Sequence, residues 1–271
     1  MASELTIIKL GGALLTDKSA PYTARKDILT AVAREIKECL DLGLLKSLIL
    51  LNGVGSFGHP PVLAHQLHKG FLGPEKLLPL SNTFRIVNEF RNMIVTHLQE
   101  AAIPVFLIHP SSMAVAEQMR MTRYFLEPVK GYMSVGLIPL LGGDMLYDSA
   151  MGWSVGSADQ LGVILAQELS ATRLIFATDV PGIYEGDPKT HAAVKLMEEI
   201  NLNELEAALE TMGMGTADAS GEMKGKLKAL IPAKGLIEKG LEISIISMME
   251  YGNLKALLKG DQVPSTRIVV A

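Results

Sequence analysis

The sequence predicts an α/β fold, built as a three-layer αβα sandwich with a mostly parallel central sheet. Short runs of aliphatic residues alternate along the chain with longer segments of helical periodicity. Several of these runs end in glycine or in small polar residues, where a buried strand would leave the sheet. Strands that are separated by helices pair in parallel and are covered by helices on both faces.

The predicted strands are short aliphatic runs bounded by turn-forming residues. The first ends at Gly11, and another ends at Gly142. They span residues 5–10, 48–51, 105–108, 137–141, 174–177, 241–247 and 268–270. Residues 145–155 predict a local hairpin, which contains Tyr147, Asp148 and Trp153.

Helices are predicted where apolar residues recur with a period of three or four. In the first, Gly43 marks the end, and the apolar positions are Ile28, Val32, Ile36 and Leu40. In the second, they are Val87, Phe90, Ile94 and Leu98. Ser157 is the expected N-cap of a third helix that runs to about residue 169. A fourth covers 222–239, with a break at Pro232.

The composition predicts one soluble, cytoplasmic domain without nucleic-acid or membrane partners. The chain has 271 residues, of which 48% are hydrophobic, enough for one large core, and no linker divides it. A net charge of −4 gives no electrostatic reason to expect nucleic acid or an anionic membrane. We expect no signal peptide, and no apolar run approaches the roughly 20 residues that span a bilayer. The single cysteine, Cys39, excludes an intramolecular disulfide and is expected to be a buried helix residue.

Glycine-rich and polar segments follow several of the predicted strands. They comprise residues 11–12, 53–59, 142–144 and 178–187. In open parallel sheets, ligands bind beyond the carboxyl ends of the strands. We therefore expect these segments to converge on one site at that edge.

The segment GVGSFGHPP, residues 53–61, begins with the pattern G-x-G-x-x-G. It has three interpretations: a dinucleotide-binding turn, a purely structural turn, or a loop whose amides bind an anion at a helix start. A dinucleotide site needs these glycines after the first strand and an acidic residue at a strand end about 20 residues on. Here they follow the second strand, and Glu75 has no strand pattern around it. The anion-binding loop is favoured, and His59 beside it is expected to contact a phosphate.

Three lysines lie near these segments. Lys9 is inside an apolar strand, where an ammonium group is costly to bury unless it meets an anion. Lys18 follows in the next loop, and Lys226 lies in DASGEMKGKLKAL; for both, a solvated surface position is the alternative. Lysines beside glycine loops favour phosphoryl transfer, where positioning and charge neutralisation dominate catalysis. The sequence contains neither a P-loop motif nor the protein-kinase motifs, so a different ATP site is expected.

Together these motifs resemble those of the amino-acid kinase superfamily. IKLGGALLTDK resembles its opening motif, GSAD at 156–159 its acid-bearing helix start, and TDVPGIYEGDPK at 178–189 its nucleotide loop. GVGSFGHP, DASGEMKGK and STRI resemble the isopentenyl phosphate kinase branch of that superfamily. The matching motifs extend from residue 7 to residue 268 and so cover nearly the whole chain.

The resemblance implies an ATP-dependent kinase that phosphorylates a small phosphate monoester, and the chemistry of ATP implies Mg²⁺. Isopentenyl phosphate is the first candidate acceptor, which would place the protein in isoprenoid biosynthesis. Within a single domain of residues 1–271, residues 1–170 would hold the acceptor and residues 171–271 would hold ATP. The resemblance also implies a homodimer formed through the acceptor half, and it supplies no clear set of metal ligands.

The resemblance further assigns roles to individual residues. Lys9, Lys18 and Lys226 would neutralise the transferred phosphoryl group, and Asp159 would hold lysines in place. The acceptor phosphate would be bound by Gly53, Val54, Gly55, Gly58, His59, Gly143 and Asp144. ATP would be bound by Gly11, Gly12, Thr178, Asp179, Val180, Gly182, Tyr184, Asp187, Pro188, Gly221 and Lys226.

The chain departs from the family motifs at Ala13, Asn52, Ser220 and Glu222. These departures leave the acceptor open, because fosfomycin-type kinases share the G-[SA]-F-G-H loop and bind a phosphonate there. A dinucleotide-binding oxidoreductase and a nucleotide sensor without turnover are alternatives from other classes. The helix positions Phe84, Ile86, Val87 and Phe90 either line a pocket for a hydrocarbon tail or pack in the core.

Overall fold

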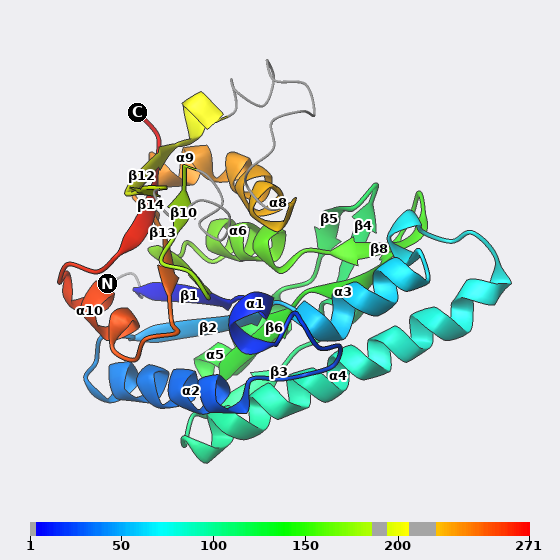
Figure 1. Ribbon diagram of the computed structural model, residues 1–271, viewed down its shortest axis with the longest axis horizontal. Coiled ribbons are helices and arrows are strands. Elements are labelled where there is room, and N and C mark those ends of the chain that lie inside the picture. The colour runs from blue at the N-terminus through cyan, green and yellow to red at the C-terminus, as the bar shows by residue number, and fades with distance from the viewer. Residues whose placement is uncertain (1–3, 186–193, 206–220) are drawn as a thin grey trace.

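The computed structural model describes residues 4–185, 194–205 and 221–271. Within these ranges, an eight-stranded sheet forms the middle layer of an α/β fold, with helices on both of its faces (Figure 1). The predicted fold class is therefore confirmed.

The main sheet is parallel apart from one edge. Its strands are β1 (Leu5–Leu10), β2 (Ser47–Asn52), β3 (Val105–Leu107), β6 (Ile138–Gly142), β9 (Arg173–Thr178), β12 (Glu199–Asn201), β13 (Glu242–Ser247) and β14 (Ser265–Val269). They lie in the order β12-β14-β13-β9-β1-β2-β6-β3. Neighbours pair in parallel except β13 and β14, which are antiparallel. All the predicted strands are present, and β12 is an addition that the sequence did not indicate.

The predicted helices are also present. The α-helices include α1 (Gly12–Leu15), α2 (Lys26–Asp41), α3 (Gly55–Ala64), α4 (Leu77–Glu100), α5 (Glu127–Ser134), α6 (Ala158–Glu168), α8 (Gly221–Leu230), α9 (Lys234–Ile237) and α10 (Asn253–Lys259). Ser157 caps α6 as expected, because its hydroxyl accepts from the amides of Asp159 and Gln160. The predicted break at Pro232 is a 3₁₀ turn (Ile231–Ala233) between α8 and α9. Further 3₁₀ turns are Leu67–Lys69, Pro74–Lys76 and Pro110–Ser112.

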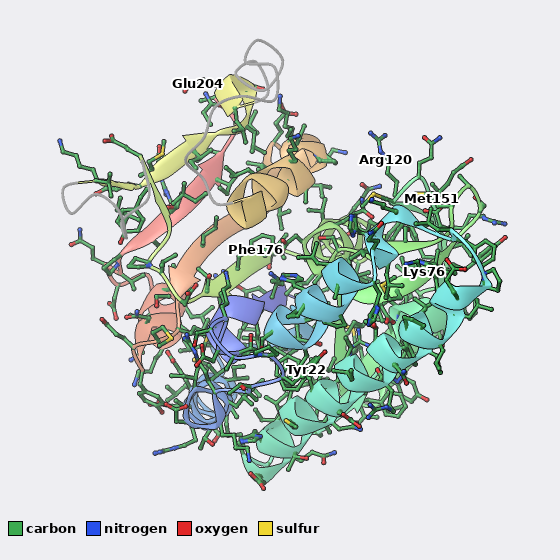
Figure 2. All side chains as sticks on the ribbon, turned by 45° about the vertical axis from the view of Figure 1, so that its right-hand side comes forward. Tyr22, Lys76, Arg120, Met151, Phe176 and Glu204 are labelled. Atoms are coloured by element: carbon green, nitrogen blue, oxygen red, sulfur yellow. The ribbon has the colours of Figure 1, made fainter. Side chains whose placement is uncertain are left out.

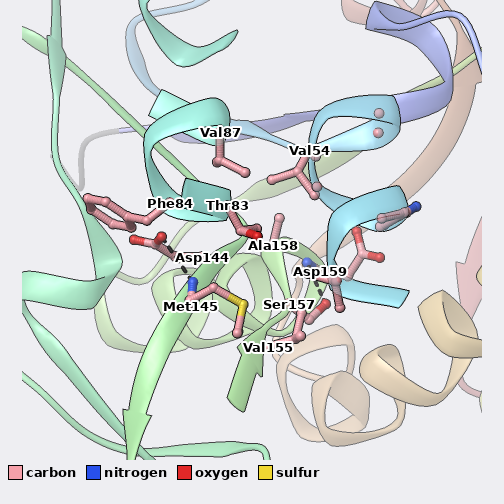
Figure 3. Close-up of a pocket in the computed structure, with 18 of the residues that line it drawn as sticks. Val54, Thr83, Phe84, Val87, Asp144, Met145, Val155, Ser157, Ala158 and Asp159 are labelled. Atoms are coloured by element: carbon pink, nitrogen blue, oxygen red, sulfur yellow. Dashed lines mark hydrogen bonds between the residues drawn. The ribbon is translucent and has the colours of Figure 1, made fainter. Parts of the chain in front are cut away.

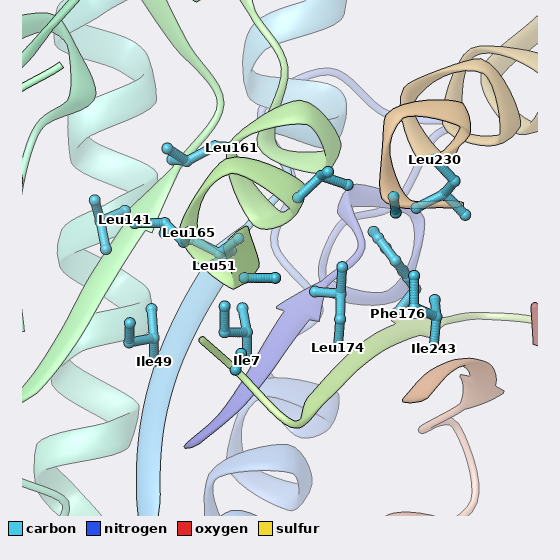
Figure 4. Packing of buried hydrophobic residues seen from close by; sticks show 14 of the residues in the cluster. Ile7, Ile49, Leu51, Leu141, Leu161, Leu165, Leu174, Phe176, Leu230 and Ile243 are labelled. Atoms are coloured by element: carbon cyan, nitrogen blue, oxygen red, sulfur yellow. The ribbon is translucent and has the colours of Figure 1, made fainter. Parts of the chain in front are cut away.

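Side chains of β1 alternate between the two faces of the sheet, as the period of a strand requires. Ile7 lies in a buried cluster with Leu165 of α6 and Leu230 of α8 (Figure 4). Its neighbour Ile8 lies in the opposite cluster, to which α2 contributes Ile36. The sheet is thus buried on both sides, which explains why its strands read as continuous apolar runs.

A second, smaller sheet stands beside the main one. Its strands are β4 (Ala114–Glu117), β5 (Arg120–Tyr124), β7 (Asp144–Asp148) and β8 (Gly152–Gly156), in the order β5-β4-β7-β8. The β7–β8 pair is the predicted hairpin. The β4–β5 hairpin was not predicted, because β5 is mostly exposed, with Arg120 at the surface (Figure 2). Its turn also lacks the usual glycine, since Gln118 and Met119 adopt positive φ values of 49° and 66°. A short antiparallel pair, β10 (Ile183–Tyr184) and β11 (Leu196–Met197), forms a separate two-stranded sheet next to β14, because the Thr266 hydroxyl bonds to Ile183 and Met197.

Asp148 joins the two turns of this smaller sheet. Its side chain is fully buried and accepts N–H groups from Met119 in one turn (2.9 Å) and from Ala150 and Met151 in the other (3.0 Å each). Burial raises the pKa of Asp148, but these amide bonds and the Ser154 hydroxyl lower it by more, to about 2. The carboxylate form is therefore the one that holds the hairpins together.

We predict that Asp148→Asn makes the fold less stable and less sensitive to acid. The folded pKa lies below the ordinary value of about 3.9, so the contribution of Asp148 is present above about pH 4 and is lost as the pH falls towards 2. Asn replaces an accepting oxygen by an N–H donor that faces backbone N–H groups. Thermal unfolding should give a lower Tm at pH 7 and a smaller drop in Tm between pH 7 and pH 3. Exposed Asp261→Asn is the control, and an unchanged acid response in Asp148→Asn would contradict the prediction.

Candidate active site

A pocket lies beyond the carboxyl ends of β1, β2 and β6, at the edge where the sequence predicts a site (Figure 3). Three of the glycine segments meet there: residues 11–12, 53–59 and 142–144. The walls are completed by α4, the N-terminus of α6 and the β7–β8 hairpin. All the residues predicted to bind the acceptor line this pocket, namely Gly53, Val54, Gly55, Gly58, His59, Gly143 and Asp144.

The first two glycine segments cross with their main chains in contact. A Cβ atom on Gly12 would lie 2.4 Å from the nitrogen of Gly55, and one on Gly53 would lie 2.6 Å from the nitrogen of Gly12. Gly55 has φ +46°, and a Cβ on it would lie 2.1 Å from Thr16 Oγ1. No larger residue fits at these positions without moving backbone. Thr16 fastens the crossing, because its hydroxyl donates to the carbonyl of Gly12 (2.7 Å) and accepts from the amide of Ser56 (3.0 Å).

The segment predicted as a loop is the helix α3 from Gly55 onward. The sequence does not predict this helix, because Pro60 and Pro61 lie inside it and glycine and proline both disfavour helices. Pro60 has no N–H for the carbonyl of Ser56, and the amide of Tyr22 donates to that carbonyl instead (3.2 Å). The N-terminus of α3 faces the pocket, where its first amides and the helix dipole favour an anion.

His59 lies in α3, so its predicted loop position was wrong. The side chain is exposed and lines the pocket beside the glycine crossing. It therefore lies next to the helix N-terminus, and a protonated or neutral imidazole there can donate a hydrogen bond to an anion.

Lys9 and Asp159 form a buried ion pair at the same end of the pocket. Lys9 Nζ lies 2.9 Å from Asp159 Oδ1, and the side chains are 7% and 14% exposed. Lys9 comes from β1, and Asp159 comes from the first turn of α6, whose start is fixed by the Ser157 cap. The carboxylate compensates the buried ammonium and keeps it at the pocket. Together with α3, this pair makes one end of the pocket suited to a phosphate group.

The lining also includes a group of apolar side chains, the apolar wall. It consists of Val54, Val62, Phe84, Val87, Met145 and Val155 (Figure 3). The α4 residues were expected either to line a tail pocket or to pack in the core, and both occur. Phe84 and Val87 line the pocket, whereas Phe90 is fully buried and its ring stacks on that of Phe57, with 4.5 Å between the ring centres. The polar and apolar ends together fit a small molecule that carries both a phosphate and a hydrocarbon group.

Gly143 and Asp144 line the pocket with polar groups that already have partners. The amide of Gly143 donates to the carbonyl of Asn52 (3.1 Å). The carboxylate of Asp144 accepts from the amide of Ser111 (3.0 Å) and lies 3.5 Å from Arg91 Nη1. These two residues thus shape the wall of the pocket. Asn52, where the family motif has histidine, is fully buried and donates to the carbonyl of Gly53 (3.2 Å).

Arg91 is the residue of this region that the sequence analysis missed. It is fully buried in α4, between the core positions Val87 and Ile94. A guanidinium on the apolar face of an amphipathic helix is rare without a buried partner. An arginine at a core position of a predicted helix therefore indicates a buried polar partner, and this was the sequence feature that pointed to Arg91.

Of the residues predicted to bind ATP, those of the described segment from Thr178 to Tyr184 follow β9, whose carboxyl end lies at the neighbouring part of the same edge. Thr178 ends β9, and the carbonyl of Ala177 before it accepts from the amide of Gly11 (2.7 Å). Gly182 packs against β14, because a Cβ on it would lie 2.3 Å from the hydroxyl oxygen of Thr266. Asp179, Val180 and Tyr184 belong to the same described segment.

Some of the predicted residues cannot be placed in the site. Asp187, Pro188 and Ser220 lie outside the described residues. Gly221, Glu222 and Lys226 belong to α8, but their side chains are outside the described part. Lys18 lies in an exposed turn and is not among the described residues that line the pocket.

The described ranges contain no group of three or more His, Cys, Asp or Glu side chains that could hold a metal ion. None of the helices described is long and apolar enough to cross a membrane. Cys39 is buried in α2, and burial raises the pKa of its thiol to about 12.

We predict that Gly12→Ala disrupts both the fold and the pocket. The new methyl group would meet the main chain of Gly55 at 2.4 Å, and backbone cannot rotate away as a side chain can. The melting temperature should fall by several degrees, in line with the 1–3 kcal/mol cost typical of overpacking. Gly131→Ala in α5 is the matched control, since nothing lies within 4 Å of its Cβ position. Equal melting temperatures for the two variants would show that the crossing tolerates a side chain.

The sequence of this chain matches a known protein family and several of its members. Residues 4–247 match the model of the amino acid kinase family. The isopentenyl phosphate kinase of Methanothermobacter thermautotrophicus is 31% identical over 97% of this chain and 98% of its own length. That of Methanocaldococcus jannaschii is 32% identical over 82% of this chain and 85% of its own length.

Solved structures agree with the sequence comparison. A structure titled "X-ray structures of isopentenyl phosphate kinase" superposes with a TM-score of 0.82 at 29% identity, and covers 98% of this chain and all of its own. A UMP kinase from Ureaplasma parvum shares the fold alone, with a TM-score of 0.63 at 12% identity over 99% of this chain and 100% of its own. The family match, the fold and the converging glycine segments all agree, and the chain belongs to the amino acid kinase family.

Proposed function

We propose that the protein transfers the γ-phosphoryl group of Mg²⁺-bound ATP to isopentenyl phosphate. The observation that carries this proposal is the division of the pocket into an anion-binding end and an apolar wall. An acceptor with a phosphate and a short hydrocarbon chain matches both ends. The names of its relatives support the same acceptor.

In the proposed reaction, an oxygen of the acceptor phosphate attacks the γ-phosphorus of ATP. The bond from that phosphorus to the bridging oxygen breaks, and ADP leaves with the electron pair. A phosphate monoester is already largely dianionic near neutral pH, since its second pKa is about 6, so no strong base is required. The chain's task is to align the two phosphates and to neutralise their charge.

Lys9 is proposed to neutralise the transferred group. It reaches the pocket from the end of β1, and its ion pair with Asp159 fixes its position. Lys18 and Lys226 are proposed to act on the same group when both substrates are bound. Asp159 would orient lysines and would not act as a base.

His59 and the N-terminus of α3 are proposed to bind the acceptor phosphate. ATP is proposed to lie along Gly11, Gly12 and the segment from Thr178 to Pro188, with Gly221 and Lys226 of α8 opposite. On this assignment, residues 1–170 hold the acceptor and residues 171–271 hold the nucleotide. Mg²⁺ would enter with ATP as part of the substrate.

A screen of acceptors with ATP and Mg²⁺ tests the function. Isopentenyl phosphate, dimethylallyl phosphate, fosfomycin and glutamate are compared by ADP release and by phosphorus NMR of the product. We expect the highest kcat/KM for isopentenyl phosphate, since its relatives are named for that acceptor, and a higher kcat/KM for both five-carbon phosphates than for fosfomycin or glutamate, because the apolar wall matches their chains. A preference for fosfomycin would support the phosphonate-kinase alternative. ATP binding without turnover of any acceptor would support the sensor.

A homodimer through the acceptor half is also proposed. Exposed apolar side chains occur there at the end of α3, in the connection to α4 and at the start of α4: Leu63, Phe71, Leu72, Leu77 and Leu78. Light scattering on the protein as it elutes from a size-exclusion column would give its molecular mass in solution. A single-chain mass at micromolar concentration would contradict the dimer.

We predict that His59→Ala impairs use of the acceptor and leaves ATP binding nearly unchanged. A hydrogen bond to a charged group contributes about 1.5–3 kcal/mol, which corresponds to a roughly 10- to 150-fold loss in acceptor kcat/KM. Gln at this position should recover part of the loss, because its amide can donate. His65→Ala, at the C-terminal end of the same helix, is the matched control. Equal losses for ATP and acceptor, with a lowered melting temperature, would give His59 a structural role only.

We predict that Lys9→Ala lowers kcat by about a hundredfold or more, with smaller changes in KM. Charge on the moving phosphoryl group is greatest in the transition state, so a group that neutralises it acts mainly there. Exposed Lys46→Ala, which removes a surface pair with Glu4, should leave kcat unchanged. If Lys9→Ala raised only the KM for ATP, Lys9 would bind the ground state instead.

A further inference from the structure

A buried charged cluster lies behind the apolar wall of the pocket. At its centre is Arg91, whose side chain is fully buried, with 0% of its surface accessible to solvent. One guanidinium nitrogen, Nη1, lies 3.5 Å from Asp144 Oδ1, and the other, Nη2, donates to the carbonyl of Gly143. A planar guanidinium can contact two groups at once in this way, since its donors lie on separate nitrogens and point in fixed directions.

The cluster connects segments that are distant in sequence. Besides Asp144, Arg91 Nη1 donates to Asn88 Oδ1 (3.0 Å) and lies 3.3 Å from His109 Nδ1. Because arginine only donates, Nδ1 must be the unprotonated nitrogen of that ring. Burial and the nearby guanidinium both lower the pKa of His109, which agrees with a neutral ring. Asp144 in turn accepts the amide of Ser111, so α4, the start of β7 and the chain after β3 are held together.

The pocket is built from the same elements. Phe84 and Val87 lie two turns and one turn before Arg91 on the same face of α4, and both line the pocket. Gly143 and Asp144 also line the pocket, with Asp144 beside Phe84 (Figure 3). Phe84 also contacts the cluster directly, with its ring 5.9 Å from that of His109. Arg91 therefore joins two parts of the pocket lining, α4 and the segment of Gly143 and Asp144, without lining the pocket itself.

We propose that Arg91 is a positioning residue for the acceptor, which fixes the Gly143 main chain relative to the α4 wall and thereby sets acceptor affinity and selection. This proposal rests on the proposed function for the identity of the acceptor. It concerns the acceptor side alone, because none of the contacts described for Arg91 reaches the Thr178 segment.

The test is Arg91→Lys, with Arg85→Lys as the matched control. Lysine keeps a positive charge beside Asp144, but its three N–H donors lie on one nitrogen, so it cannot span the two positions that Nη1 and Nη2 of Arg91 occupy against Asp144 and the Gly143 carbonyl. Arg85 lies on the exposed side of the same helix and pairs with Glu89, so the identical substitution there leaves the pocket intact. Steady-state kinetics with isopentenyl phosphate, a longer prenyl phosphate and ATP are measured for the wild type and both variants.

For Arg91→Lys we expect the acceptor KM to rise about tenfold or more, with kcat less affected and the KM for ATP within about twofold. The ratio of kcat/KM between isopentenyl phosphate and the longer prenyl phosphate should fall, because the walls are no longer held at a fixed separation. A residue that served stability alone would change both substrates equally and leave that ratio unaltered. Such an outcome, or kinetics identical to those of Arg85→Lys, would overturn the proposal.

Amide hydrogen exchange supplies a readout that needs no acceptor. Exchange in a peptide covering residues 142–147 should be faster in Arg91→Lys than in the wild type, with peptides of β9 and β13 unchanged. If the wild type phosphorylates none of the acceptors, the proposed function fails, while this comparison still decides the role of Arg91. Should Arg91→Lys not fold, Asn88→Ala removes one acceptor of the guanidinium and is expected to give a smaller change in the same direction. Unchanged exchange at 142–147 in the folded variant would contradict the positioning role.

Discussion

The approach of two main chains at Gly12 and Gly55 is the constraint on which the rest of the site depends. It brings the end of β1 and the start of α3 to a distance that no side chain permits. The turn after the first strand and the helix after the second thereby become one rigid unit. Lys9, which precedes the turn, and His59, which lies in the helix, then line the same pocket.

The sheet supplies the rest of the arrangement. Parallel neighbours end at one edge, so the residues that follow β1, β2, β6 and β9 are neighbours in space although they are far apart in sequence. The charges at this edge are compensated locally: Lys9 has Asp159, and Arg91 has Asp144. Neither buried cation lacks a carboxylate partner, which is the condition under which such charges are tolerated in a core.

The sequence predicts the main sheet and the long helices well, because each buries a regular apolar face. It fails for α3, where Gly58, Pro60 and Pro61 contradict helical propensity and tertiary contacts stabilise the helix instead. It fails also for β5, whose side chains are mostly exposed and carry no period. Within the site, glycines and Lys9 are recognisable from strand ends. The role of Arg91 cannot be predicted in this way, because its contact residues, such as His109 and Gly143, are more than 15 residues away in the sequence.

The proline-interrupted start of α3 has a consequence for the architecture of the chain. The Ser56 carbonyl, which Pro60 leaves without its usual partner, is satisfied by the amide of Tyr22. The segment that follows β1 is therefore part of the scaffold of α3 and more than a connection to α2. The fold would tolerate a new chain terminus at the exposed tip near Ser19, at the expense of the position of Lys18, but a cut at Tyr22 or Thr23 would also remove a support of the helix. Circular permutation of this protein is thus restricted by a hydrogen bond that a regular helix would not need.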